Sequence, residues 1–208
     1  MMKRKPMLFH KIMNGPFGGG REVIGLIGTH HGVGVTHTGL MLAFYLGEEL
    51  GKKTAFLECN NHHDMMLIQE AYDWNEEGDG SFSFHQITCF KEVTSNRIIN
   101  IFGEAYDCLI LDFGTDFLSN REEFLRCSTK IVVGGSSEWD IQKLSRFTEA
   151  TKVIHGSASW KYFIPQADDK KVTRISNELQ RKVWSVPRTE EPTLPSYTSC
   201  RFFSRLFQ

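Results

Sequence analysis

A glycine-rich stretch over residues 28–37 constrains the fold of this chain more than any other feature of its sequence. It follows the apolar run 23–27 and opens a segment, from residue 36 to about residue 50, whose apolar residues have helical spacing. A strand, a glycine-rich loop and a helix in that order form the setting of a phosphate-binding loop, in which backbone N–H groups and the helix N-terminus face an anion. The sequence therefore predicts an anion-binding turn near the start of an α/β domain.

The loop departs from the usual phosphate-binding pattern at one important position. Gly32 and Gly34 can bring successive N–H groups onto a phosphate, and Thr36 supplies a hydroxyl that would ligate Mg²⁺. The pattern G-x-x-x-x-G-K-S/T is met from Gly28 only with one extra residue, and Val35 stands where the lysine belongs. A hydrogen bond to a charged group contributes about 1.5–3 kcal/mol to binding, whereas losing one charge-stabilising donor slows a reaction by about 10²–10³. We therefore expect nucleotide binding without useful turnover, with a purely structural turn as the alternative.

Residues 30–37 resemble the deviant phosphate loop, K-G-G-x-G-K-S/T-S/T, of the MinD/ParA family of partitioning and positioning ATPases. The resemblance places His30 at the lysine that reaches the partner's nucleotide, and Val35 at the lysine that contacts the β- and γ-phosphates. It implies ATP or ADP with Mg²⁺ as the cofactor. The loop residues that it assigns to cofactor binding are Gly28, His30, His31, Gly32, Val33, Gly34, Val35, Thr36 and His37.

Two later segments resemble further parts of the same family in the same order. Residues 53–60 resemble the second strand, with Glu58 and Asn60 at the two acidic positions that usually end it. The strand that ends near Asp112 resembles the Walker B strand, so the resemblance makes Asp112 and Thr36 the Mg²⁺ ligands and places Gly114 near the γ-phosphate. A turn or helix-capping role for Asp112 is the alternative.

The likeness covers residues 22–188, after an N-terminal extension over residues 1–21 and before a tail over residues 189–208. Strands that are nearly continuous apolar runs alternate with helical patterns, which is typical of a parallel sheet covered on both faces. The predicted fold is a three-layer α/β domain with a doubly wound, mainly parallel sheet. Further strands are expected at 130–135, 160–165 and 183–187, and helices at 96–104, 120–126, 139–151 and 170–181.

Composition excludes several classes of protein. A formal net charge of −1 gives no general reason to expect attraction to nucleic acid or to a membrane. The five cysteines are scattered and never in C-x-x-C spacing, which indicates reduced thiols. The basic start at residues 2–5 precedes no long apolar segment, so we expect no secretory signal and a cytoplasmic protein.

Five histidines fall in two loops that we expect to be neighbours, because both follow strands of one sheet. They are His30, His31, His37, His62 and His63, with Asp64 alongside. Their spacing matches no standard metal pattern, so Zn²⁺ is not expected. A protonated histidine that replaces part of the lost lysine charge, and histidines that are simply exposed to solvent, stay open as alternatives.

The last eight residues form a short amphipathic segment that resembles the C-terminal membrane-targeting helix of MinD-type proteins. Its apolar face carries Phe202, Phe203, Leu206 and Phe207, and its polar face carries Arg201, Arg205 and Gln208. Docking to the inner membrane surface or to a protein is one interpretation. Packing back onto the domain is the other.

The resemblance implies a positioning or assembly factor that self-associates through the face of the phosphate loop. By analogy alone, a pilus or secretion apparatus is a candidate assembly, as for the TadZ-type branch of the family. Because both lysine positions are changed, the sequence predicts a pseudo-ATPase. An active ATPase that uses loop histidines, and an adaptor that binds no nucleotide, are the two rival hypotheses.

Overall fold

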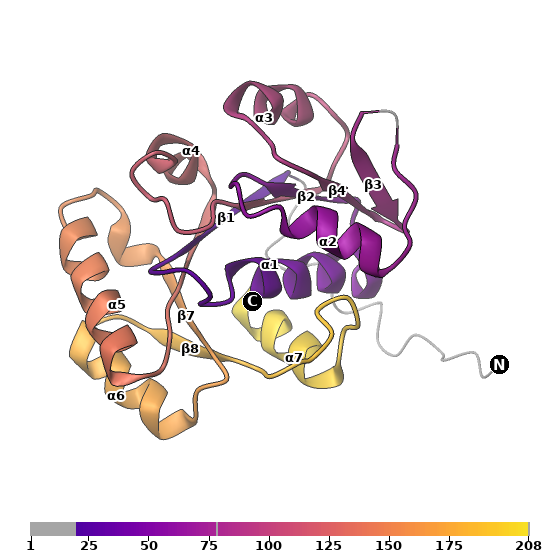
Figure 1. Ribbon diagram of the computed structural model, residues 1–208. Coiled ribbons are helices and arrows are strands. Elements are labelled where there is room, and N and C mark those ends of the chain that lie inside the picture. Colours follow the sequence, from indigo (N-terminus) through magenta and orange to yellow (C-terminus); the bar gives the residue numbers. More distant parts are fainter. Residues whose placement is uncertain (1–19, 78, 208) are drawn as a thin grey trace.

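A computed structural model describes residues 20–77 and 79–207, and within them eight strands form one sheet in the order β3-β4-β2-β5-β1-β6-β7-β8 (Figure 1). The strands are β1 Glu22–Gly28, β2 Thr54–Glu58, β3 Ser81–Phe84, β4 Ile87–Phe90, β5 Cys108–Asp112, β6 Thr129–Val133, β7 Lys161–Pro165 and β8 Val183–Val186. The α-helices are α1 Val35–Phe44, α2 Asp64–Ala71, α3 Ser95–Phe102, α4 Arg121–Arg126, α5 Glu138–Thr151, α6 Asp169–Leu179 and α7 Tyr197–Leu206.

The central strand β1 lies between β5 and β6 and is parallel to both. Of the sheet's neighbouring pairs, only β3 with β4 is antiparallel. The parallel direction places the ends of β1, β2 and β5 at one edge, where Leu26 is level with Asp112 and Glu58 is level with Asp112. Ligands of doubly wound sheets bind at this edge.

Alternating residues of the strands divide the core into two layers. In β5, Ile110 packs in the layer that includes α1, Met65 of α2 and α7, whereas Leu111 packs in the layer that includes α3, α4, α5 and α6. Helices on both faces explain why the central strands are apolar without a break. The predicted three-layer, doubly wound and mainly parallel fold is confirmed.

The helix predicted from residue 36 to about residue 50 is divided. After α1, residues Tyr45–Glu49 form a π-helical turn, in which the N–H of Leu50 donates to the carbonyl of Tyr45 at 3.3 Å. The three further strands and the four later helices lie where the sequence predicts them, within two residues at each end. Most of the N-terminal extension expected over residues 1–21 lies outside the described residues.

The sequence analysis missed α2 and the hairpin of β3 and β4. Met65 is the one described α2 residue that is buried, so this helix has little apolar periodicity. The hairpin turns at His85, which takes a left-handed φ of 51° without the glycine or asparagine that usually marks such a turn. Local sequence therefore carried weak signals for both elements.

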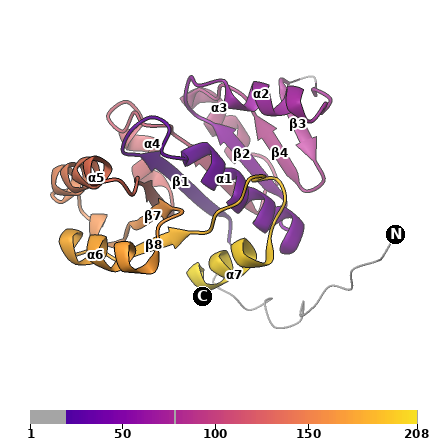
Figure 2. The ribbon, with the colours of Figure 1, turned by 60° about the horizontal axis from the view of Figure 1, so that its bottom comes forward.

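The C-terminal helix α7 lies against the domain (Figure 2), and its apolar side chains belong to the core. The ring of Phe203 lies 5.5 Å from that of Tyr45 on the π-helical turn, and the ring of Phe202 lies 5.5 Å from that of Phe163 on β7. Phe203 and Leu206 are buried. Of the two interpretations of this segment, the structure shows packing onto the domain.

Candidate functional site

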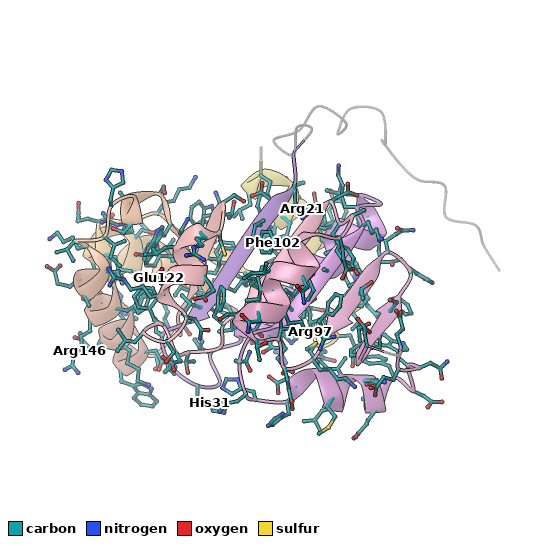
Figure 3. The ribbon with its side chains drawn as sticks, turned by 90° about the horizontal axis from the view of Figure 1, so that it is seen from above. Arg21, His31, Arg97, Phe102, Glu122 and Arg146 are labelled. Atoms are coloured by element: carbon teal, nitrogen blue, oxygen red, sulfur yellow. The ribbon has the colours of Figure 1, made fainter. Side chains whose placement is uncertain are left out.

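The glycine-rich stretch curls between the central strand β1 and α1, at the edge of the sheet opposite to Arg21 (Figure 3). Gly32 and Gly34 take left-handed φ values of 78° and 96°, which glycine adopts at no steric cost. The N–H of Gly28 donates to the carbonyl of Gly114 at 2.7 Å, so the loop is joined to the end of β5. This is the shape of an anion-binding turn at a helix N-terminus.

Val35 stands at the position that the resemblance gives to the lysine of such a loop, and its side chain is turned inward. A Cβ atom on Gly28 would lie 2.6 Å from Cγ2 of Val35 and 2.9 Å from Cγ1 of Val33. Val35 is buried, so the apolar side chain fills the interior of the loop. The loop therefore offers N–H groups and a helix end to an anion, but no cationic side chain at this position.

Asp112 lies beneath the loop at the end of β5 and is completely buried. Its Oδ1 accepts the N–H of Gly114 at 2.9 Å, whereas its Oδ2 is buried without a hydrogen-bond partner. Burial raises the pKa of Asp112 to about 6, although the nearby Thr36 hydroxyl and the N–H of Gly114 act in the opposite direction. An ionised carboxylate whose oxygen has no partner is unfavourable in a protein interior. A bound cation would offset this unfavourable burial.

Two further carboxylates stand beside Asp112. The hydroxyl of Thr36 donates to Oδ2 of Asp64 at 3.0 Å, which joins the start of α1 to the start of α2. Glu58 is buried and accepts the N–H groups of Met65 at 3.2 Å and Glu92 at 3.5 Å, and burial raises its pKa. In the part of the chain that the structure describes, no lysine or arginine forms an ion pair with any of these three acids.

The donor set of Thr36, Asp64 and Asp112 fits a hard divalent cation. Mg²⁺ usually takes one or two protein carboxylates and completes its shell with water and phosphate oxygens. Among the described residues, no group of three or more His, Cys, Asp or Glu side chains could hold a metal ion. Mg²⁺ needs fewer protein ligands than a structural Zn²⁺ site, which takes four side chains. Two carboxylates and a hydroxyl are therefore enough for Mg²⁺.

His30 is held by its own chain. Its Nε2 lies 3.0 Å from Oδ1 of Asp140 at the start of α5, and its Nδ1 lies 2.9 Å from the hydroxyl of Thr29. Burial lowers the pKa of His30 more than the Asp140 carboxylate raises it. The imidazole is therefore mostly neutral at pH 7 and does not replace the charge of a lysine.

The other histidines are dispersed rather than gathered at one point. The rings of His31 and His62 lie 5.0 Å apart, edge to face, so the two loops are neighbours as predicted. His63 pairs with Glu92 at 2.5 Å, and its own backbone is left-handed with a φ of 61°. His37 has a buried Nε2 atom without a hydrogen-bond partner.

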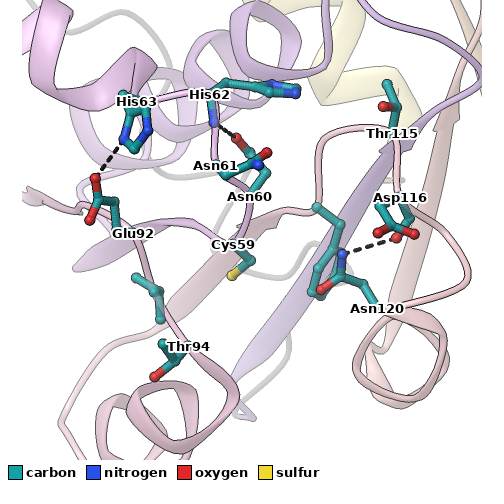
Figure 4. Close-up of a pocket in the computed structure, with 12 residues that line it drawn as sticks. Cys59, Asn60, Asn61, His62, His63, Glu92, Thr94, Thr115, Asp116 and Asn120 are labelled. Carbon is teal, nitrogen blue, oxygen red and sulfur yellow. Dashed lines mark hydrogen bonds and ion pairs between the residues drawn. The ribbon is translucent and has the colours of Figure 1, made fainter.

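A cavity of about 410 Å³ lies beside the loop, among the turns that follow β2, β4 and β5 (Figure 4). It is lined by Cys59, Asn60, Asn61, His62, His63, Glu92, Val93, Thr94, Phe113, Thr115, Asp116 and Asn120. The sequence analysis missed the contribution of Glu92, because it missed the strand β4 that places this residue. A clearer turn signal at His85 would have revealed the hairpin and hence the loop.

No protein-family model and no curated protein matches the sequence. Solved structures do match the fold. A ParA family ATPase from Chlorobium tepidum superposes with a TM-score of 0.66 at 14% identity, over 89% of this chain and 97% of that chain. A plasmid partition protein from Borrelia burgdorferi bound to AMPPNP gives 0.65 at 10% identity, over 90% and 97%.

MinD from Pyrococcus horikoshii complexed with Mg-ADP matches with a TM-score of 0.62 at 14% identity, over 89% of this chain and 94% of that chain. Each of these matches covers about nine-tenths of this chain. The chain therefore has the MinD/ParA-type P-loop ATPase fold.

Proposed function

We propose that this protein is a nucleotide-binding positioning factor that hydrolyses ATP slowly or not at all. The observation that carries the proposal is the glycine curl between β1 and α1, with Thr36 and Asp112 beneath it. Neighbours in fold were solved with AMPPNP and with Mg-ADP. The retained N–H groups and helix N-terminus support binding of the same class of ligand here.

The expected loss of turnover rests on two side chains. Phosphoryl transfer depends almost wholly on positioning and on stabilising charge. Val35 is apolar, and the neutral His30 is paired with Asp140. Neither supplies the cation that would stabilise the transferred phosphoryl group, so this geometry favours binding over hydrolysis.

Mg²⁺ would be held by Thr36 and Asp112, and when bound it would neutralise phosphate charge. Thr36 presents its hydroxyl at the start of α1, and the orphaned Oδ2 of Asp112 is the acceptor that a cation or its water would satisfy. Gly114 fixes the other oxygen of Asp112, so the carboxylate has one defined orientation.

The protein partner that we propose first is a second copy of the chain, docked on the loop face. Leu118 is 84% exposed in the turn after β5, and Trp139 is 70% exposed at the start of α5, next to the residue that holds His30. Large exposed apolar side chains near a site support a protein-facing surface. Through such contacts the protein would position an assembly.

We also propose a cytoplasmic setting, which the five free cysteines support. Within the described ranges, none of the helices has both the length and the apolar character needed to cross a membrane.

Calorimetric titration of the full chain with Mg-ATP, Mg-ADP and Mg-GTP tests the proposal. We expect one nucleotide per chain and phosphate release no faster than the buffer background. A Gly34→Val variant, strained at a φ of 96°, should lose binding, whereas Gly51→Val, strained at a φ of 64° but far along the chain in open space, is the matched control. If no nucleotide produces binding heat, the proposal is wrong and the adaptor hypothesis is favoured. If phosphate release is rapid and Asp112→Ala abolishes it, the active ATPase is favoured.

A further inference from the structure

Asp64 is an acid at the site to which the resemblance of the loop assigns no role. It is the first residue of α2, and its carboxylate accepts the hydroxyl of Thr36 at 3.0 Å. This contact joins two segments that are 28 residues apart. The Thr36 hydroxyl has a single proton to donate, and in this structure it donates to Asp64.

Because the Thr36 hydroxyl donates to Asp64, it donates no hydrogen bond to the buried carboxylate of Asp112. Asp112 is 0% exposed, and its Oδ2 has no hydrogen-bond partner. Glu58, level with Asp112 on the adjacent strand, adds a third acid in a buried position. Thr36, Glu58 and Asp64 all act electrostatically on Asp112. The described chain brings no lysine or arginine into an ion pair with the three acids.

We infer that this site binds a divalent cation in the absence of nucleotide, with the Asp64 carboxylate as a ligand alongside Thr36 and Asp112. Carboxylate and hydroxyl oxygens are the ligands of hard cations such as Mg²⁺ and Mn²⁺. The cation supplies the positive charge that Val35 lacks, and it gives the orphaned oxygen of Asp112 a partner. When nucleotide is bound, a phosphate oxygen is one of the ligands of the cation. Without nucleotide, the Asp64 carboxylate supplies that ligand.

Charge also sets the order of binding. A nucleotide phosphate meets repulsion at a site with three acids that pair with no described lysine or arginine, and a bound cation removes this repulsion. The cation therefore enters before or with the nucleotide. This second step rests on the proposed function, whereas binding of the cation alone does not.

Electron paramagnetic resonance of free Mn²⁺, measured with the full chain and without nucleotide, tests the inference. We expect one Mn²⁺ per chain, displaced by excess Mg²⁺. Asp64→Asn should weaken the affinity at least tenfold, because the amide keeps the size of the side chain and the acceptor for Thr36 but loses the charge. Asp116→Asn, on an exposed acid at the same edge of the sheet, should leave the affinity unchanged.

Two results would overturn the inference: an undiminished free Mn²⁺ signal, or equal affinities of the wild type and Asp64→Asn. Circular dichroism melting establishes that each variant is folded, and Asp64→Glu, which restores the charge, should regain part of the affinity if the first variant is perturbed. Calorimetry with nucleotide separates this inference from the proposed function. If the protein binds Mn²⁺ but no nucleotide, the cation site is upheld and the proposed nucleotide binding is rejected. If it binds nucleotide but no Mn²⁺ alone, the proposed function is upheld and this inference is rejected.

Discussion

The Nε2 atom of His30 lies 3.0 Å from the Oδ1 atom of Asp140, so the first histidine of the loop is fastened to α5 of its own chain. The resemblance of the loop gives this position to a lysine that reaches a partner's nucleotide. Here the side chain points to an internal acid, and burial keeps the imidazole mostly neutral. This contact anchors the loop to α5. The side chain of His30 therefore carries little positive charge that could act across an interface.

Restoring the missing charge should strengthen nucleotide binding. Val35→Lys places an ammonium group on the loop, and a hydrogen bond to a charged group contributes about 1.5–3 kcal/mol, which corresponds to roughly a 10- to 150-fold lower Kd. Calorimetric titration with Mg-ADP measures the change. Phosphate release should stay low, because His30 is unchanged.

The matched control for this variant is Val35→Met, which lengthens the same side chain without adding charge. If both variants bind Mg-ADP equally well, added length rather than charge is responsible. An affinity of Val35→Lys equal to that of the wild type would contradict the assignment of position 35 as the place of the lysine.

Asp112 should destabilise the protein at neutral pH. Its pKa is raised from 3.8 to about 6 in the folded state, so the folded protein binds the proton more tightly than the unfolded chain does. The contribution of Asp112 to stability is therefore most favourable at acid pH and falls as pH rises from about 4 to about 6, by about 3 kcal/mol for two pKa units. Asp112→Asn should raise the free energy of unfolding by about 1–3 kcal/mol at pH 8.

Urea unfolding at pH 4.5 and pH 8, without divalent cations, checks this prediction. The amide oxygen of asparagine can still accept the N–H of Gly114, so the variant removes charge with little change of shape. The gain should shrink strongly at pH 4.5. Asp116→Asn, on an exposed acid in the following turn, should show no comparable gain.

His37 should have the opposite effect on acid stability. Burial lowers its pKa below 6.5, outweighing the Thr189 backbone and the Glu191 carboxylate, which act to raise it. The folded state therefore binds this proton less tightly than the unfolded chain, and stability is lost as pH falls below about 6.5. Its unpartnered Nε2 means that His37→Met removes this loss without breaking a hydrogen bond at that atom.

Melting temperatures measured between pH 7.5 and pH 5 test the effect of His37. The difference between His37→Met and the wild type should move in favour of the variant as pH falls. His155→Met alters an exposed imidazole, and it serves as the control for general loss of a histidine. A constant difference between His37→Met and the wild type at all pH values would refute the assignment.

The layers and strand order follow from features that are local in the sequence. Continuous apolar runs such as β5 can be satisfied only between two layers of helices, so the pattern predicts a parallel sheet. The hairpin of β3 and β4 gave no such signal, because its turn depends on His85 in a left-handed conformation that tertiary packing supports. Secondary structure set by tertiary contacts is not visible in a short window of sequence.

The site was predictable in outline and not in detail. The glycine curl and the position of Asp112 follow from spacing between strand and loop, and the sequence also predicts that the loops of His31 and His62 are neighbours. The bond of Thr36 to Asp64 and the pair of His30 with Asp140 depend on side-chain directions, which spacing does not determine. The roles assigned to the loop residues in nucleotide binding stay predictions until a ligand is measured.

The C-terminal helix should contribute strongly to stability. Phe203 is completely buried, with its ring 5.5 Å from that of Tyr45, and truncating a buried phenylalanine to alanine costs about 3–5 kcal/mol. Urea unfolding of Phe203→Ala should show a loss of this size. Tyr197→Ala, on a residue of the same helix that is 80% exposed, should change stability by less than about 0.5 kcal/mol. Equal, small losses in both variants would mean that α7 separates readily from the domain, and its apolar face would then be free to dock elsewhere.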